Sequence, residues 1–167
     1  DYQWVIEQSI NEKLKVLGTI DILFSLESGD KNILNKLGEK EGFSSLFHLS
    51  SQSGAYLCDK ASEPQLVGED FSFIIDAAIH GVRCIAKLPN LEFYLIDFNE
   101  QKKEAWVANI SSEIFLSPFD RTQDQNGSGE LMLFDGSGTV FFSTFPKEEK
   151  LHQKVQQFGQ IVDITLQ

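Results

Sequence analysis

Residues 4–26 carry a helical repeat that constrains the fold more than any other feature of the chain. Apolar residues recur there at steps of three and four, with charged residues off the stripe. The stripe consists of Ile6, Ile10, Leu14, Leu17, Ile20 and Phe24. Because this spacing is typical of one face of an α-helix, we predict one continuous helix with this face at least partly buried. The helix could form one side of a core, or it could be a stalk that transmits motion toward a membrane.

Turn residues divide the next part of the chain into short elements. A Ser-Gly-Asp stop is followed by apolar side chains that predict a short second helix ending by Gly42. Apolar runs on both sides of a Ser/Gly-rich turn predict a β-hairpin over residues 43–58. Residues 69–80 again place apolar side chains at helical spacing, and Gly81 is typical of a helix C-terminus.

Strand-like runs dominate the rest of the chain. Three of them end in turn residues or lie next to proline: 82–88, 92–98 and 105–115. The second and third flank a polar turn, which predicts another hairpin. Residues 120–130 are polar, contain Gly and Ser and lack periodicity, so we interpret them as a linker. The remaining predicted elements are a hairpin over 131–145, a short polar helix over 147–158 and a final strand over 161–166.

The chain is acidic. Its 167 residues include 14 basic and 25 acidic side chains, which gives a formal net charge of -11. This charge balance excludes nonspecific nucleic-acid binding and argues against docking on anionic lipid, because both need clustered cations. The apolar fraction of 41% is sufficient for a folded core. No apolar run approaches the ~18 residues that a membrane-spanning helix needs.

Motifs for catalysis, metals and cofactors are missing or incomplete. The sequence contains no phosphate-binding Gly-rich loop and no nucleophile elbow. A segment resembling a calcium loop, residues 122–133, lacks the first and last acidic ligands. Gly81 separates His80 from Cys84, which disfavours a zinc site. We therefore expect no metal, no cofactor and no catalytic residues in this part of the protein.

Four aromatic residues and one arginine are the candidate ligand-binding residues. Phe71 and Phe73 stand at the start of the predicted middle helix, and Arg83 follows its end. Tyr94 and Trp106 lie in predicted central strands. Each aromatic residue could instead belong to the core, and Arg83 could lie on the surface. Because arginine recognises carboxylates bidentately, we predict Arg83 as the main contact of an anionic ligand, with the aromatic side chains as walls.

The order of these elements resembles the Cache family of extracytoplasmic, PAS-like sensor domains, in particular its double-module form. In that family a segment like residues 68–73, with its pair of aromatic side chains, precedes a helix that ends like residues 77–81. The second module opens with a segment like residues 129–138, which contains Leu-Phe-Asp-Gly.

The resemblance implies an α+β fold with a long N-terminal helix and a PAS-like five-stranded antiparallel sheet that has helices on one face. It divides the chain into an N-terminal helical stalk, a sensor module and a partial or reduced second module: 1–42, 43–118 and 119–167. A small anionic metabolite, a carboxylate or an amino acid, would bind between sheet and helix.

The same resemblance implies that the chain is the periplasmic or extracellular part of an inner-membrane receptor whose spans lie outside it. Outputs attached to such domains include histidine kinases, chemoreceptors, diguanylate cyclases and PP2C-type serine phosphatases. A homodimer through the N-terminal helix is expected as a further possibility. The alternative is an intracellular α+β module, PAS-like, GAF-like or immunity-type, that binds another protein in the cytoplasm.

A PAS-like strand order also makes a prediction about Cys58 and Cys84. It places their strands at opposite edges of the sheet, four strand spacings or about 19 Å apart. A disulfide needs Cα atoms within about 7 Å, so we expect two free thiols.

Overall fold

The computed structural model describes residues 2–26, 32–87, 92–110, 132–134, 140–143 and 161–163. The first of these ranges is helical throughout except at one turn. Helix α1 (Tyr2–Leu17) and helix α2 (Ile20–Leu26) are separated by Gly18 and Thr19, so the prediction of one continuous helix is wrong at this point. Glycine and a β-branched residue are weak helix formers. Here the backbone N–H and the hydroxyl of Thr19 both donate to the Val16 carbonyl, at 3.0 and 2.7 Å.

The next elements follow the predicted order. Helix α3 (Asn32–Glu41) leads through a short turn into the long strand β1 (Phe43–Gln52). Strand β2 (Ala55–Ala61) returns antiparallel to β1. The turn residues Ser53 and Gly54 both have positive φ, 52° and 84°, as a tight two-residue hairpin turn requires. The predicted hairpin is therefore confirmed.

A short 3-10 helix, Pro64–Leu66, precedes helix α4 (Ser72–Ala78). The end of α4 is built as a glycine cap, with Gly81 at φ 84°. The N–H groups of Gly81 and Val82 donate back to the carbonyls of Ala78 and Ala77, the pairing of a Schellman motif. This cap turns the chain sharply into the next strand.

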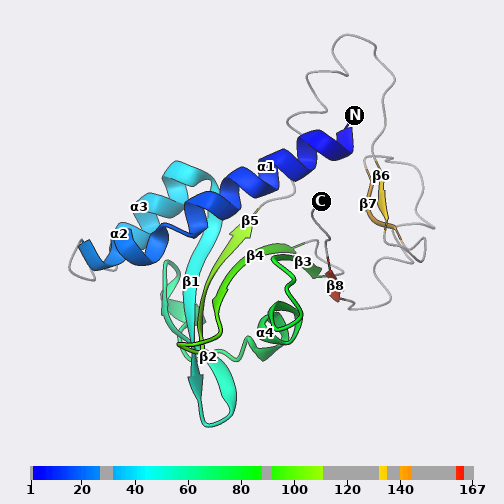
Figure 1. Ribbon diagram of the computed structural model, residues 1–167. Helices are drawn as coiled ribbons and strands as arrows, with labels where there is room; N and C mark the ends of the chain where they lie inside the picture. Colours follow the sequence, from blue (N-terminus) through cyan, green and yellow to red (C-terminus); the bar gives the residue numbers. More distant parts are fainter. Residues whose placement is uncertain are drawn as a thin grey trace.

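Three strands complete the main sheet: β3 (Cys84–Lys87), β4 (Glu92–Asn99) and β5 (Glu104–Ile110). The strand order is β2-β1-β5-β4-β3-β8, where β8 is Ile161–Asp163, and every neighbouring pair is antiparallel (Figure 1). The α+β class and the five-stranded antiparallel sheet are confirmed, and β8 adds a sixth strand beside β3. Strands β6 (Met132–Phe134) and β7 (Val140–Ser143) pair with each other in a separate sheet. The predicted linker and the helix predicted over 147–158 lie outside the described residues.

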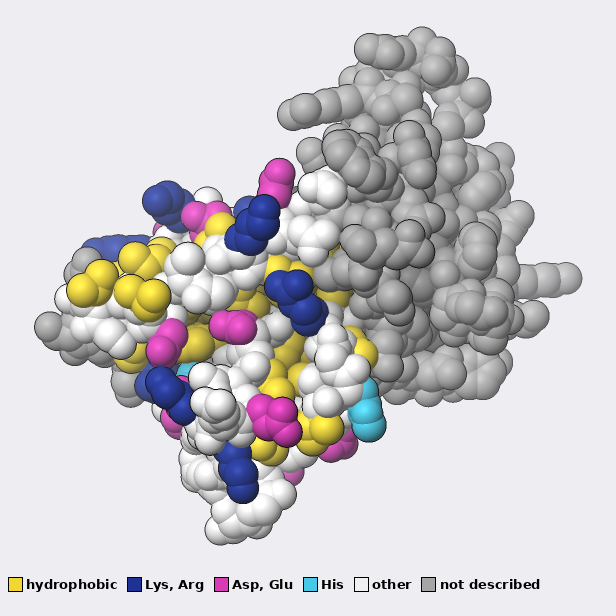
Figure 2. Space-filling view, in the orientation of Figure 1, with side chains coloured by type: hydrophobic (Ala, Val, Ile, Leu, Met, Phe, Trp, Pro, Cys, Tyr) yellow, Lys and Arg dark blue, Asp and Glu magenta, His cyan; other side chains and the backbone are white. Residues whose placement is uncertain are grey.

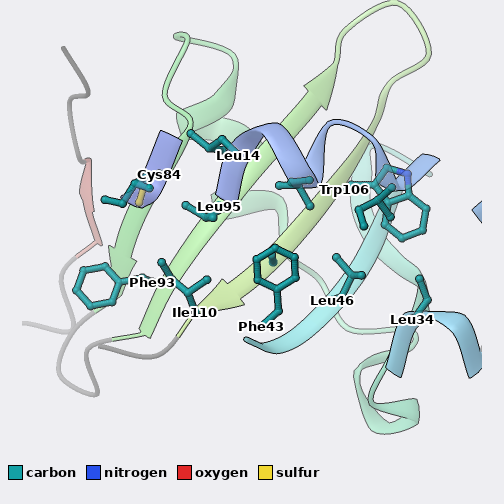
Figure 3. Packing of buried hydrophobic residues seen from close by; sticks show 13 residues of the cluster. Leu14, Leu34, Phe43, Leu46, Cys84, Phe93, Leu95, Trp106 and Ile110 are labelled. Carbon is teal, nitrogen blue, oxygen red and sulfur yellow. The ribbon is translucent and has the colours of Figure 1, made fainter. Parts of the chain in front are cut away.

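Helices cover both faces of the main sheet instead of one. Alternate residues of β4 and β5 show the reason, because Phe93 and Trp106 point to one face while Tyr94 and Val107 point to the other. A sheet with apolar side chains on both faces must be covered on both. Helices α1 to α3 pack on the first face, named here the helical-layer face (Figures 1 and 3). Helix α4 packs on the opposite face, named here the α4 face (Figure 1).

The predicted apolar face of the N-terminal helix is part of this core from Ile10 onward, and the side chain of Ile6 lies outside the described part. Ile10, Leu14, Leu17 and Ile20 are buried in the helical-layer cluster, and Phe24 packs against it. The described part of α1 is therefore one side of the core. Among the described residues, no helix is long and apolar enough to cross a membrane.

Both cysteines are free thiols, as predicted. Cys58 lies on β2 and Cys84 on β3, and three strands separate β2 from β3. The two side chains also belong to opposite faces, since Cys58 packs on the α4 face and Cys84 on the helical-layer face. Burial raises the pKa of Cys58 to about 11, with help from the nearby Asp59 charge, and burial raises the pKa of Cys84 to about 12.

Candidate functional site

Three of the predicted site residues come together on the α4 face. Phe71, Phe73 and Tyr94 join Phe47 of β1 in a closed circuit of ring contacts, named here the aromatic quartet. The ring centroids are 4.6 Å apart for Phe47–Phe71 and 6.1 Å for Phe71–Phe73. They are 6.0 Å apart for Phe73–Tyr94 and 6.4 Å for Phe47–Tyr94, and these two pairs meet edge to face. This is the favourable geometry for aromatic pairs.

The segment before α4 fixes the position of the quartet by pairing with the outer edge of β2. The Phe71 N–H donates to the Tyr56 carbonyl at 2.9 Å, and the Cys58 N–H donates to the Glu69 carbonyl at 3.0 Å. The Gly68 N–H donates to the Cys58 carbonyl at 2.8 Å. Segment 68–71 therefore occupies an edge that would otherwise present unpaired backbone groups.

Asp70 and Ser72 close the N-terminus of α4. The Asp70 carboxylate accepts hydrogen bonds from the Ser72 hydroxyl and from the Ser72 N–H, at 2.5 and 2.8 Å. These hydrogen bonds hold the pKa of Asp70 below its ordinary value. The Ser72 hydroxyl oxygen also accepts from the Tyr56 N–H at 3.0 Å, so the helix start is tied to β2 as well.

Arg83 lies beyond the other end of α4. Its side chain is exposed, and its carbonyl accepts the Ile96 N–H at 2.8 Å. The charge of Arg83 acts on Asp97 of β4: burial raises the pKa of Asp97, Arg83 lowers it in part, and Asp21 raises it further. Arg83 is therefore an exposed residue just before β3, and its positive charge acts on the Asp97 carboxyl group.

Trp106 is separated from the aromatic quartet by the sheet itself. It belongs to the helical-layer face, whereas the quartet belongs to the α4 face. The structure thus brings Phe71, Phe73 and Tyr94 together and places Trp106 in different surroundings.

Those surroundings are a line of polar and aromatic residues that crosses four strands. Lys60 is the register partner of His48, His48 of Trp106, and Trp106 of Asp97. We name these four residues the cross-strand row. Register partners on one face lie close enough for their side chains to interact, and the row runs across the sheet under α2.

A β-bulge adds a fifth residue to the row. His48 pairs with Lys60 and Leu49 pairs with Cys58, so Asp59 has no register partner. Bulges redirect side chains, and here the Asp59 carboxylate lies 2.7 Å from Nδ1 of His48. Burial opposes ionisation of Asp59, but the hydrogen bond and charge of His48 and the charge of Lys60 outweigh it, so the pKa of Asp59 is lowered.

The second ring nitrogen of His48 also faces a carboxylate. Nε2 of His48 is 3.5 Å from Oε2 of Glu104 on β5. The His48 side chain is 4% exposed and stands between two acidic side chains from neighbouring strands. Among the described residues, no group of His, Cys, Asp and Glu side chains is arranged to hold a metal ion.

Trp106 connects this centre to helix α2. Its ring lies 4.8 Å from the His48 ring and 5.6 Å from the Phe24 ring, centroid to centroid. Its Nε1–H donates to the Asp21 carboxylate at 3.2 Å. The Lys60 ammonium lies 4.9 Å from the Phe24 ring centroid and 5.9 Å from that of Trp106, within the range of cation–π attraction.

His48, Asp59 and Glu104 were not predicted as site residues from the sequence. The one visible signal was a histidine inside the apolar run of residues 43–49, where a buried polar side chain needs partners. Its partners are contributed by different strands, and the Asp59 contact depends on the bulge. No spacing along the chain encodes these contacts.

Comparison of the whole chain with protein-family models, with curated proteins and with solved structures finds no match.

Proposed function

We propose that the chain is the ligand-sensing domain of a membrane signalling receptor of the Cache-like, PAS-like kind, located in the periplasm or outside the cell. One observation carries the proposal. The five strands β1 to β5 have the order β2-β1-β5-β4-β3, with α4 and its preceding loop on one face. That order is the one expected for a PAS-like sensor. A likeness of fold is an argument by analogy, so the rest of the proposal depends on the site.

The aromatic quartet is the candidate binding region. Phe73 is partly exposed, whereas Tyr94 behind it is 5% exposed. A ligand entering between α4 and β4 would therefore contact Phe73 first and Tyr94 next. Arg83, an exposed residue that follows the end of α4, is the cation that we propose to pair with a ligand carboxylate. The expected ligand is a small carboxylate or an amino acid.

The helical layer is the candidate output surface. Helix α1 is packed on the sheet, so a change in the sheet would reach the N-terminal helices directly. At α2, Ile22 is 64% and Leu26 is 74% exposed. The space-filling view shows hydrophobic side chains at the end of the molecule where Figure 1 places α2 (Figure 2). A homodimer through this layer is the expected assembly, and an output domain would lie outside the chain.

Thermal unfolding in the presence of a panel of small carboxylates and amino acids tests the proposal. A compound present at 100 times its Kd adds about 2.7 kcal/mol of stability, or roughly 5–11 °C in Tm for a domain of this size. Arg83→Ala should weaken binding of the active compound ~10–150-fold, the value of a charge-assisted hydrogen bond. Lys102→Ala, which removes an exposed cation from the β4–β5 turn, should leave the affinity unchanged.

Two results would count against this function. No shift in Tm with any compound of the panel would remove the support for a small-molecule sensor. Equal affinities of the parent and Arg83→Ala would remove Arg83 from the site.

The second candidate is an intracellular protein-interaction module. The exposed Ile22 and Leu26 favour it, because they lie one helical turn apart on the same side of α2. Sequencing the gene on both sides of the segment that encodes residues 1–167 separates the two functions. Membrane spans on either side support the sensor, and their absence supports the module.

A further inference from the structure

The ligand-sensing proposal uses the α4 face and leaves the cross-strand row on the opposite face unused. That row contains a buried histidine with a carboxylate at each ring nitrogen. We propose that His48 is a proton-operated switch, whose charge determines how firmly α2 is held on the sheet. This inference does not depend on the ligand-sensing function.

The geometry around His48 suits the protonated ring. An ionised carboxylate accepts hydrogen bonds and cannot donate them, whereas a neutral imidazole has one N–H and one bare nitrogen. Asp59 at 2.7 Å from Nδ1 and Glu104 at 3.5 Å from Nε2 can both be satisfied only when both nitrogens carry hydrogen. A neutral ring leaves a lone pair facing a carboxylate.

Loss of the proton therefore changes one contact selectively. The shorter contact to Asp59 survives with an N–H on Nδ1, and the contact between Nε2 and Glu104 becomes repulsive. The His48 side chain is 4% exposed, whereas the Glu104 side chain is 30% exposed. Glu104 can turn toward water while the buried ring cannot, so deprotonation opens the β5 side of the row.

Trp106 carries the change to α2. His48 lies against one part of the indole, and Asp21 of α2 accepts the indole N–H at 3.2 Å. Phe24, also from α2, packs on the same indole. These contacts of Asp21 and Phe24 with Trp106 join α2 to β5. A displacement of Trp106 therefore weakens the packing of α2 on the sheet.

Other charged groups surround this centre from each neighbouring element. Lys60 and Asp59 face His48 from β2, and Glu104 faces it from β5. On the far side of Trp106, Asp21 comes from α2 and Asp97 from β4. The pKa of Asp59 is lowered, so Asp59 stays ionised across the pH range in which histidine side chains ordinarily titrate.

The fluorescence of Trp106 between pH 5 and pH 8 tests the switch. The chain has two tryptophans, so the experiment uses a Trp4→Phe background in which Trp106 is the single emitter. We expect one sigmoidal transition in that range. Hydrogen exchange of the α2 amides, corrected for the intrinsic pH dependence, should be about tenfold less protected at pH 8 than at pH 5.5.

Three variants identify the titrating group. His48→Gln should abolish both the fluorescence transition and the pH dependence of exchange. His80→Gln, which changes an exposed histidine beyond α4, should retain both. Glu104→Gln should also abolish the pH dependence, because the introduced amide can donate to a bare Nε2 and accept from a protonated one.

The Glu104→Gln variant keeps the test decisive even if His48→Gln fails to fold. The side chain of Glu104 is partly exposed, and glutamine has the same shape as glutamate. A transition that persists in Glu104→Gln with unchanged amplitude overturns the proposal. So does a parent protein whose Trp106 emission and α2 exchange show no transition between pH 5 and pH 8.

Discussion

Replacing Leu17 by Ala is the most direct test of the packing between the N-terminal helices and the sheet. Leu17 is 0% exposed and belongs to the helical-layer cluster. The change removes three carbons, and their transfer to water costs about 2.4 kcal/mol at ~0.8 kcal/mol for each. The cavity left behind raises the expected loss of unfolding free energy to about 3–5 kcal/mol. Urea unfolding followed by circular dichroism measures it, with an unchanged m-value.

Ile79→Ala is the control, because it also removes three carbons, at a side chain that is 58% exposed and lies outside the helical layer. It should alter stability by less than about 0.5 kcal/mol. Equal effects of the two substitutions would refute the reasoning. They would mean that α1 is not docked on the sheet through the face that contains Leu17.

Three further predictions concern other parts of the described fold. Gly81→Ala should destabilise the fold by about 1–2 kcal/mol, because Gly81 has φ 84°. Gly38→Ala should stabilise the fold by up to about 1 kcal/mol, because Gly38 lies inside a helix and a Cβ there meets its nearest atom at an ordinary 3.5 Å. Thermal unfolding of both variants measures the two effects. Cys58 and Cys84 should react slowly with a thiol reagent in the native protein, because both are buried. Unfolding without reductant should yield two reactive thiols, and a count of zero thiols would contradict the strand order. Asp70 has a lowered pKa because of hydrogen bonds from its neighbour, so its carboxylate stabilises the fold above the ordinary aspartate pKa, and this contribution is lost as the pH falls through the lowered value. Asp70→Ala should therefore have a lower Tm than the parent at neutral pH and the same Tm in acid, and a difference independent of pH would show that the carboxylate charge is not responsible.

Local sequence features account for much of the observed fold. The turn at Ser53-Gly54, the glycine cap at Gly81 and the apolar stripe of α1 each depend on residues close in sequence. Such features can be predicted from the backbone preferences of single residues and from the periodicity of apolar residues. The sequence also contains a signal for the break at Gly18, because glycine weakens a helix interior. The apolar stripe continues past Gly18, however, and the stripe alone predicts one continuous helix.

Features that depend on pairing between strands could not be predicted from the sequence in the same way. The distribution of helices over both faces follows from the alternation of residues such as Phe93 and Tyr94, and the sequence does not show which helix covers which face. The separation of Trp106 from the aromatic quartet is also a consequence of alternation. The His48 centre requires the register of β1 with β2 and β5, together with a bulge at Asp59.

The central claim is that a small ligand binds between the sheet and α4. Methyl NMR with selectively labelled isoleucine tests it directly, because buried isoleucines lie on both faces of the sheet. Ile74, Ile75 and Ile96 report on the α4 face, and Ile10 and Ile110 report on the helical-layer face. Titration with the panel compound that raises Tm most should shift the first group strongly and the second group little. Larger shifts in the second group, or no shift in either at saturating concentrations of the whole panel, would contradict the claim.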